Sequence, residues 1–294
     1  MEDQVNKGIK YMLFASLLFA LMGAAAKELS DSMSSVEVVF FRNVFGVLLI
    51  LISIYKSPLN QLGGKFWLLV FRGFAGFVAL LFFFYNISKI PLGEAMTFSK
   101  TSTIFTAIFA YMFLKEKLGF RGWIGVFVGF IGIIFITEFD GSSLEKTDYL
   151  GILSGVGAAL AYTSVRELRK FYDSRAIVLS FMTIGTIGPM ILMIIGSFYT
   201  NPHLDFMLGT FTMPKSSDWI YIILLGVFAT FAQIYMTKAY SFAKAGIIGT
   251  ISYSNIAFSI ILGLILGDSF PSILIIFGIL LIVLSGLLVS SKKE

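Results

Sequence analysis

Residues 101–136 read TSTIFTAIFAYMFLKEKLGFRGWIGVFVGFIGIIFI, which is two apolar runs joined by a short basic connection. A helix needs about 20 apolar residues to cross a hydrocarbon layer roughly 30 Å thick. The first run begins upstream at Leu92, which makes it long enough to cross, and the second run is shorter. Neither run has the ten-residue alternation of an outer-membrane barrel strand. The segment therefore predicts membrane-spanning helices, whose backbone hydrogen bonds are satisfied internally.

The rest of the chain has the same apolar character. Of its 294 residues, 57% are apolar and 13% are charged, the mean hydropathy is +0.89, and there is no cysteine. A soluble domain is nearer to about 45–50% apolar and about 25% charged. The composition excludes a disordered chain, a disulfide scaffold and an ordinary cytosolic enzyme. It predicts an all-α integral membrane protein.

Ten apolar stretches account for most of the chain, with short connections between them. These predict ten transmembrane helices, at roughly Gly8–Ala26, Ser35–Ile54, Phe66–Ile87, Leu92–Leu114, Gly122–Ile136, Leu150–Glu167, Ala176–Phe198, Trp219–Lys238, Ala245–Leu266 and Ser272–Ser290. Three G-x-x-x-G pairs within this set would let helix backbones approach closely. They are Gly125/Gly129, Gly151/Gly155 and Gly263/Gly267.

The basic residues predict how the chain is oriented. With the N-terminus in the cytoplasm, the connections on the outer side carry only Lys27, Lys89, Lys146 and Lys215. The cytoplasmic side carries Lys7, Lys10, Lys56, Lys65, Lys115, Lys117, Arg121, Arg169, Lys170, Arg175, Lys238, Lys244, Lys292 and Lys293. Cytoplasmic loops are enriched in Lys and Arg, so both termini are expected inside, at the inner membrane. The net charge of +5 needs no nucleic acid to explain it.

The two halves of the chain resemble each other. A shift of 152 residues places Trp67 on Trp219 and Ser102 on Ser254, and it aligns the third, fourth and fifth spans with the eighth, ninth and tenth. Each half, 1–147 and 148–294, would then contain five spans. Because five is odd, the second half would enter the membrane upside down. Such a 5+5 inverted repeat is typical of transporters that open alternately to the two sides.

Several motifs resemble one transporter family. TSTIFTAIFA at 101–110 followed by FLKEKL at 113–118 is similar to the motif of the drug/metabolite transporter superfamily, EamA-type branch. LMGAAAK at 21–27 and FFRN at 40–43 also resemble that family. The resemblance covers essentially the whole chain and implies a ten-helix inverted repeat that moves a small metabolite. The family often has proline where this chain has Thr103 and Asn255, so the resemblance leaves open whether these helices are kinked.

Polar groups inside the hydrocarbon layer are costly, and Lys100 is the clearest case. It lies about two turns inside the fourth span, near neither membrane surface. One hypothesis is that Lys100 binds an anionic group of the substrate while Glu94 gates the site or exchanges a proton. The alternative is that Lys100 pairs with a buried acid such as Glu94 or Glu167 and only orders the bundle.

Other polar side chains are candidates for lining a central cavity. The repeat would place Ser252, Tyr253 and Asn255 of the ninth span opposite Lys100 and Thr103 of the fourth. The alternative is that these hydroxyls bond to carbonyls of their own helices. Further candidates for substrate binding are Tyr85, Tyr162 and Gln233.

Two arginines also fall within spans. Arg42 could attract anions or act as a gate, or it could pair with Glu37 or Glu28. Arg72 is expected to extend to the cytoplasmic surface. The excess of basic over acidic groups inside spans favours an anionic or zwitterionic substrate.

Enzyme chemistry and metal binding have little support. His203 is the sole histidine, and the chain lacks a Ser-centred nucleophile motif and a His-Glu-x-x-His motif. We therefore expect no cofactor, no metal and no catalytic residue, and as partners only the bilayer and a small solute. A lipid flippase or an exporter of amphiphiles is the alternative on the same fold, and the oligomeric state is left open.

Overall fold

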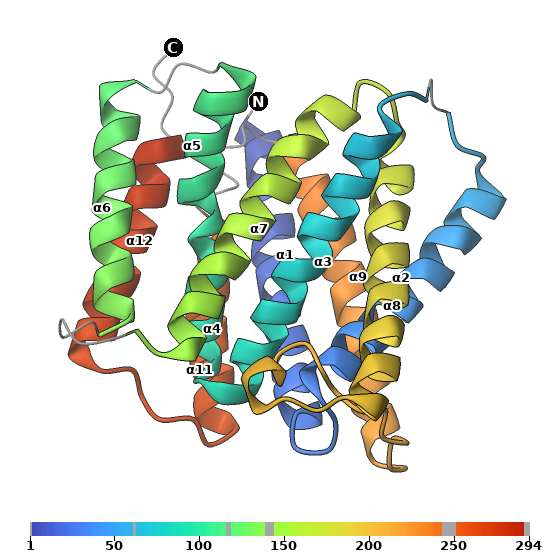
Figure 1. Cartoon of the computed structure of the whole chain (residues 1–294). Coiled ribbons are helices and arrows are strands. Elements are labelled where there is room, and N and C mark those ends of the chain that lie inside the picture. The colour runs from blue at the N-terminus through green and yellow to red at the C-terminus, as the bar shows by residue number, and fades with distance from the viewer. Residues whose placement is uncertain (1, 61–62, 116–118, 139–143, 243–250, 291–294) are drawn as a thin grey trace.

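The computed structural model describes residues 2–60, 63–115, 119–138, 144–242 and 251–290, and this part of the chain consists of helices and connections without strands (Figure 1). The helices are α1 Glu2–Leu29, α2 Ser35–Lys56, α3 Phe66–Lys89, α4 Leu92–Lys100, α5 Ser102–Leu114, α6 Phe120–Ile136, α7 Lys146–Leu168, α8 Ser174–Phe198, the short 3₁₀ helix η1 Pro202–Leu204, α9 Asp218–Phe242, α11 Ser254–Ile265 and α12 Ile273–Ser290. Part of the expected span Ala245–Leu266 lies outside the described residues.

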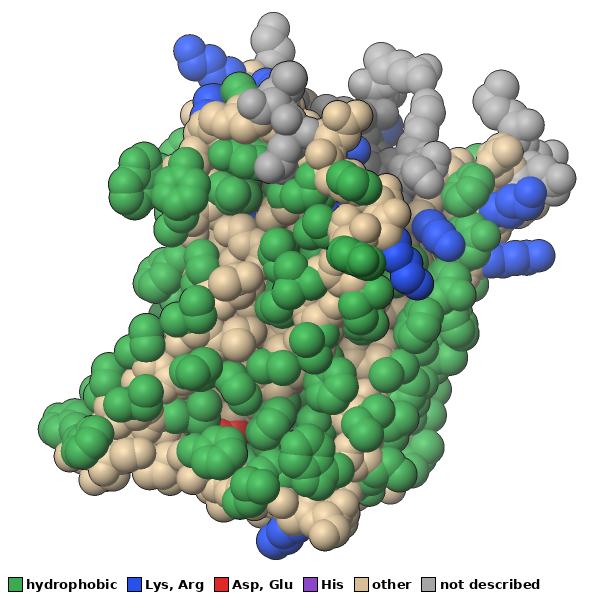
Figure 2. Space-filling model, turned by 90° about the vertical axis from the view of Figure 1, so that its right-hand side faces the viewer, with side chains coloured by type: hydrophobic (Ala, Val, Ile, Leu, Met, Phe, Trp, Pro, Cys, Tyr) green, Lys and Arg blue, Asp and Glu red, His purple; other side chains and the backbone are tan. Residues whose placement is uncertain are grey.

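The helices lie side by side in one bundle, and both ends of the chain lie at the same end of it (Figure 1). Five helices, α1, α2, α3, α8 and α9, contain stretches long and apolar enough to cross a membrane, and α6, α11 and α12 are shorter and apolar. On the face shown in Figure 2, hydrophobic side chains cover the middle of the molecule, and most Lys and Arg side chains lie toward the end where the termini are. This distribution is that of a protein embedded in a bilayer.

Buried apolar side chains form two main clusters. One joins α1, α2, α3 and α4 to α8 and α9, with Leu29, Leu81, Phe84 and Ile222 among its members. The other joins α4 and α5 to α6, α11 and α12 around Ile104 and Ile282. The fourth predicted span therefore contributes to both clusters, which places it between the two parts of the bundle.

Two of the three glycine pairs allow close helix packing, as expected. A Cβ on Gly125 would lie 3.0 Å from the Ser285 carbonyl of α12, and one on Gly155 would overlap the Thr101 hydroxyl. The third expectation was wrong. Gly267 lies beyond the end of α11 with φ +92°, and no atom lies within 4 Å of where its Cβ would be, so it serves the turn.

Candidate functional site

The expected fourth span is broken at Thr101. The sequence predicted one helix over Leu92–Leu114, but α4 ends at Lys100 and α5 begins at Ser102. The Thr101 hydroxyl donates to the Phe98 carbonyl at 2.7 Å, and the Ser102 hydroxyl donates to the Ser99 carbonyl at 2.7 Å. Side-chain hydroxyls that bond back to the preceding turn compete with the helical ladder, which explains a break without proline.

A second break occurs at the corresponding position of the other half. Tyr253 is 152 positions after Thr101, has φ −69° and ψ −17°, and immediately precedes α11. The Ser254 hydroxyl donates to the Ile251 carbonyl at 2.7 Å, as Ser102 does in the first half. Asn255 is buried, and its amide donates to the Ser16 carbonyl of α1 at 2.9 Å.

The two broken helices contact each other, since α4 packs against α11. The half-buried Thr103 approaches Tyr253, although the Tyr253 hydroxyl makes no hydrogen bond of acceptable geometry within the described part of the chain. That hydroxyl fills the space where a Cβ on Gly286 of α12 would lie. Tyr253 is therefore buried against α12.

Lys100 forms no ion pair with any residue that the structure describes. The expected alternative partner Glu167 is occupied, because its carboxylate pairs with Lys65 and with Lys170, each at 2.6 Å. The prediction of a Lys100–Glu167 pair was wrong. No bond joins Lys100 to Glu94 either. The ammonium group at the end of α4 is therefore half-buried beside a helix break, without a described acidic partner.

Glu94 lies beside a network at the end of the bundle opposite the termini. In this outer network, Lys27 of α1 pairs with Asp268, and its ammonium donates to the Ile90 carbonyl at 3.1 Å. Asp268 also accepts the Leu92 N–H at the start of α4, at 2.8 Å. Glu94 is half-buried and close enough to interact electrostatically with both Lys27 and Asp268. The network joins the first half of the chain to the α11–α12 connection.

Arg42 lies on the buried half of α2 and does not pair with Glu37. The Glu37 carboxylate accepts the Ser34 N–H at 2.8 Å and the Thr212 N–H at 2.7 Å, which caps α2 and fixes the α8–α9 connection. The alternative of an Arg42–Glu37 pair was therefore wrong, and no described bond joins Arg42 to Glu28. Instead the guanidinium donates to the Asn43 side chain at 2.9 Å and lies 5.6 Å from the centre of the Phe181 ring.

Arg72 is buried, contrary to the expectation that it reaches the cytoplasmic surface. It is 7% exposed, and its guanidinium carbon lies 4.4 Å from the centre of the same Phe181 ring. Tyr162 of α7 is 53% exposed and close enough to interact electrostatically with both arginines. Sequence reasoning missed Arg72 and Phe181, although a second arginine within a predicted span was a usable signal.

Tyr85 lies with the connections at the end of the bundle opposite the termini (Figure 1). Its hydroxyl donates to Asp205 at 3.0 Å, and Asp205 also pairs with Lys146. Burial alone would raise the pKa of Asp205, but the hydrogen bonds from Lys146 and Tyr85 outweigh it and hold that pKa below its usual value. Tyr85 and Asp205 line a pocket of about 200 Å³.

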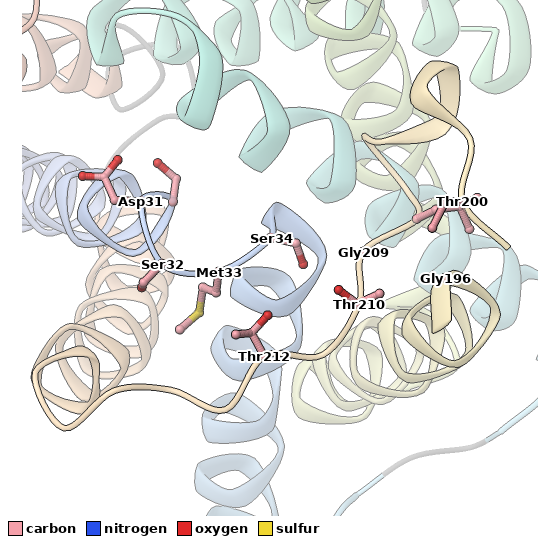
Figure 3. Close-up of a pocket in the computed structure, with 11 residues that line it drawn as sticks. Asp31, Ser32, Met33, Ser34, Gly196, Thr200, Gly209, Thr210 and Thr212 are labelled. Atoms are coloured by element: carbon pink, nitrogen blue, oxygen red, sulfur yellow. The ribbon is translucent and has the colours of Figure 1, made fainter. Parts of the chain in front are cut away.

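A larger pocket of about 440 Å³ lies next to it, between the α1–α2 and α8–α9 connections (Figure 3). Ser34 and Thr212 point toward it from the two connections (Figure 3). No predicted site residue lines this larger pocket, and of the two pockets only the smaller contains one, Tyr85.

The remaining predicted residues are Gln233 of α9 and Ser252, which are half-buried, and each interacts with another residue. Among the described residues, no three His, Cys, Asp or Glu side chains are grouped so that they could hold a metal ion.

Comparison with known proteins agrees with this architecture. The model of the EamA-like transporter family matches residues 6–138 and again residues 145–291. A protein described as an uncharacterized transporter from Helicobacter pylori (strain ATCC 700392 / 26695) is 35% identical over 99% of this chain and 96% of its own length. The pseudopaline exporter CntI of Pseudomonas aeruginosa (strain UCBPP-PA14) is 28% identical over 99% of both chains.

A solved structure titled only as a protein crystal structure shares the fold. It has a TM-score of 0.59 and 16% sequence identity, over 98% of this chain and 96% of the other. The relatives are transporters, and the two family matches together cover nearly the whole sequence. The chain is thus a multi-pass membrane protein that belongs to the EamA-like transporter family.

Proposed function

We propose that this protein is a secondary transporter that moves a small anionic or zwitterionic metabolite across the inner membrane by alternating access. Its two halves, 1–147 and 148–294, each contribute five spans of opposite orientation, and the substrate binds between them near the helix breaks. The protein carries out no covalent chemistry and needs no cofactor or metal. Its partners are the solute and the bilayer, and it binds no nucleic acid.

Helix contacts support the inverted repeat. In an inverted repeat, α7, α8 and α9 of the second half correspond to α1, α2 and α3 of the first. Each contact between the halves should then have a counterpart: α1 packs against α9, and correspondingly α7 packs against α3. The same correspondence relates α2–α9 to α8–α3 and α1–α11 to α7–α5, and these contacts also occur. The breaks at Thr101 and Tyr253 obey the same 152-residue offset. Two similar packings of one half against the other are what alternating access requires.

The half-buried, unpaired ammonium of Lys100 is the observation that carries the proposal. A charge inside the membrane is costly unless a partner or water compensates it. Lys100 lies at the junction of the two apolar clusters, directly beside a break that leaves the helix ladder incomplete. A carboxylate or another anionic group of a solute would compensate this charge.

Orientation follows from the basic residues. Both termini lie at the end toward which Lys and Arg side chains gather, so this end is assigned to the cytoplasm (Figures 1 and 2). The outer network of Lys27 and Asp268 then closes the opposite side. The structure would accordingly represent a state that is closed to the outside.

Transport by purified protein in proteoliposomes tests the proposal. Labelled amino acids, organic acids and nucleotides are offered in counterflow, and wild-type protein should exchange at least one of them. Lys100→Ala should reduce exchange at least tenfold while the protein remains folded. The matched control is Lys170→Ala, because Lys170 is an exposed lysine at the end of α7 and should leave exchange unchanged. Unchanged uptake and affinity in Lys100→Ala would refute the assignment of the site.

Two further arms of the assay address coupling and substrate class. Glu94→Gln should flatten the pH dependence of exchange, and a wild-type pH dependence in this variant would remove Glu94 as a proton carrier. Movement of a labelled lipid, with no exchange of any soluble metabolite, would refute solute transport in favour of a flippase.

A further inference from the structure

Arg42, Arg72 and Phe181 form a cluster that the proposed Lys100 site does not use. Phe181 belongs to α8, and its ring lies 5.6 Å from the guanidinium carbon of Arg42 on α2 and 4.4 Å from that of Arg72 on α3. Both arginines are buried, with 6% and 7% of their surface exposed. Two like charges thus lie against one aromatic ring inside the bundle.

The cluster is short of acceptors. Nε of Arg42 and both Nε and Nη1 of Arg72 are buried without a hydrogen-bond partner in the described part of the chain. No described carboxylate pairs with either arginine. A guanidinium does not give up its proton in proteins, so the cost of burying it unpaired cannot be avoided by neutralisation. The cation–π contacts with Phe181 offset only part of this cost.

Neighbouring groups hold the arginines in place. The side-chain oxygen of Asn43 accepts a hydrogen bond from Nη1 of Arg42. The side-chain NH₂ of Asn43 donates to the Val39 carbonyl at 2.8 Å and to the Gly185 carbonyl of α8 at 3.1 Å. The Arg72 side chain lies along its own helix, next to Gly76. A Cβ on Gly76 would lie 3.0 Å from Nη1 of Arg72 and 2.9 Å from the Phe181 ring. The side chains are therefore positioned by packing before any ligand binds.

We propose that Arg42 and Arg72 bind an oxyanion group, a carboxylate or a phosphate, of the transported solute. Guanidinium groups form short charge-assisted hydrogen bonds to such groups, often through two N–H donors at once. The site is built from α2 and α3 of the first half and α8 of the second, so it lies across the interface that moves in alternating access. Tyr162 of α7 borders it with a ring that is 53% exposed. This inference rests on the proposed function and specifies the chemical class of its substrate.

Thermal unfolding in neutral detergent tests the site without requiring a known substrate. Acetate, glycine, malonate and inorganic phosphate are titrated against sodium chloride of equal ionic strength. At least one oxyanion should raise Tm in a saturable way, because a ligand that binds only the folded state stabilises it by mass action. Arg42→Gln and Arg72→Gln should each weaken the apparent affinity about tenfold or more, since each removes charge-assisted hydrogen bonds. The matched control Arg169→Gln alters an exposed arginine and should behave as wild type.

Other variants separate a binding role from a structural one. Arg72→Lys keeps the charge and should retain part of the response, whereas Gly76→Ala keeps both arginines but crowds Nη1 and should weaken it. If the Gln variants lower Tm and retain the full anion response, the arginines only brace Phe181 and the proposal is wrong. It is also wrong if no oxyanion raises Tm, or if only phosphatidylglycerol in the micelles does so. Oxyanion binding without any exchange in proteoliposomes would refute the transport function and leave the site intact.

Discussion

The outer network and the arginine cluster differ in how charges inside the bundle are compensated. In the outer network, Lys27 has a carboxylate and a carbonyl as partners, and Asp268 also accepts an N–H from α4. In the arginine cluster, Arg42 and Arg72 lie against the same aromatic ring, only Arg42 has an amide oxygen as acceptor, and three of their donors have no described partner.

This difference separates two roles for scarce charge in a membrane protein. Paired charges join helices at one end of the bundle, and breaking one pair should cost stability. Unpaired cations such as Lys100 and the two arginines already destabilise the fold, so their removal should cost little stability and should affect ligand binding instead. The free energy of unfolding in detergent, measured for variants of both kinds of charge, tests this contrast.

The largest loss of stability is expected for Asp268→Ala. The substitution leaves the ammonium of Lys27 without its anion and the Leu92 N–H without its acceptor, in a site where the two side chains are 22% and 11% exposed. Breaking a buried pair by removing one partner costs roughly 3–5 kcal/mol, and the partial exposure reduces this to about 2–3 kcal/mol. Chemical unfolding followed by tryptophan fluorescence measures the loss.

A double variant distinguishes a coupled pair from two independent residues. Lys27→Ala combined with Asp268→Ala should be less destabilised than the sum of the single variants, because neither charge is left alone. Asp205→Ala is the control for an exposed pair, with side chains 38% and 45% exposed, and should cost at most about 1 kcal/mol. Equal losses at Asp268 and Asp205 would contradict the contrast between a closing network and a surface contact.

Much of the fold was accessible from the sequence, because hydropathy determines where helices lie in a membrane. The limits of α2 at Ser35 and α3 at Phe66 match the expected spans. The break at Thr101 was not predicted. It is caused by hydrogen bonds from side-chain hydroxyls to backbone carbonyls, and the presence of Thr or Ser in a sequence does not show whether such bonds form. The Lys65 partner of Glu167 and the Thr212 partner of Glu37 were also beyond prediction, since both lie on connections distant in sequence.

The next largest effect is expected for Gly155→Ala, where α7 crosses the helix break. A Cβ there would overlap the Thr101 hydroxyl and lie 3.3 Å from the Ser102 nitrogen, so the Thr101 side chain must move and lose its bond to Phe98, or the helices must separate. Overpacking of this kind typically costs about 1–3 kcal/mol. Gly119→Ala is the matched control, because a Cβ on Gly119 meets no atom within 4 Å. A loss at Gly155 no greater than at Gly119 would show that α7 does not hold the break.

The residues of the candidate site differ in how far the sequence alone could predict them. Lys100 could be proposed from the sequence because an ammonium two turns into an apolar run is costly to bury. Pseudo-symmetry predicts the position of Tyr253 along its helix, but not that its ring packs against Gly286. The arginine cluster needed the structure, because α2, α3 and α8 meet only in three dimensions.

A smaller effect of opposite sign is expected for Lys100→Met. Methionine fills similar volume without a charge, so removing an unpaired cation should leave stability unchanged or raise it by up to about 1 kcal/mol. Lys27→Met, which removes a paired cation, should instead destabilise the protein. Unfolding curves of the two variants make the comparison directly, and a loss at Lys100 as large as that at Lys27 would mean that Lys100 has a structural partner.

The smallest effect is expected for Asp205 and depends on pH. Burial favours its neutral form, but hydrogen bonds from Lys146 and Tyr85 prevail and keep its pKa below the usual 3.8. A lowered pKa in the folded state stabilises the fold above the ordinary value, and this contribution is lost as pH falls through the folded pKa. Asp205→Asn should therefore be slightly less stable than wild type at pH 7, by less than about 1 kcal/mol for so exposed a pair, and the gap should narrow as the pH falls below 4. Asp31→Asn in the neighbouring α1–α2 connection is the control. A gap for Asp205→Asn that does not narrow as the pH falls below 4 would show that its hydrogen bonds, and not its charge, stabilise this end of the bundle.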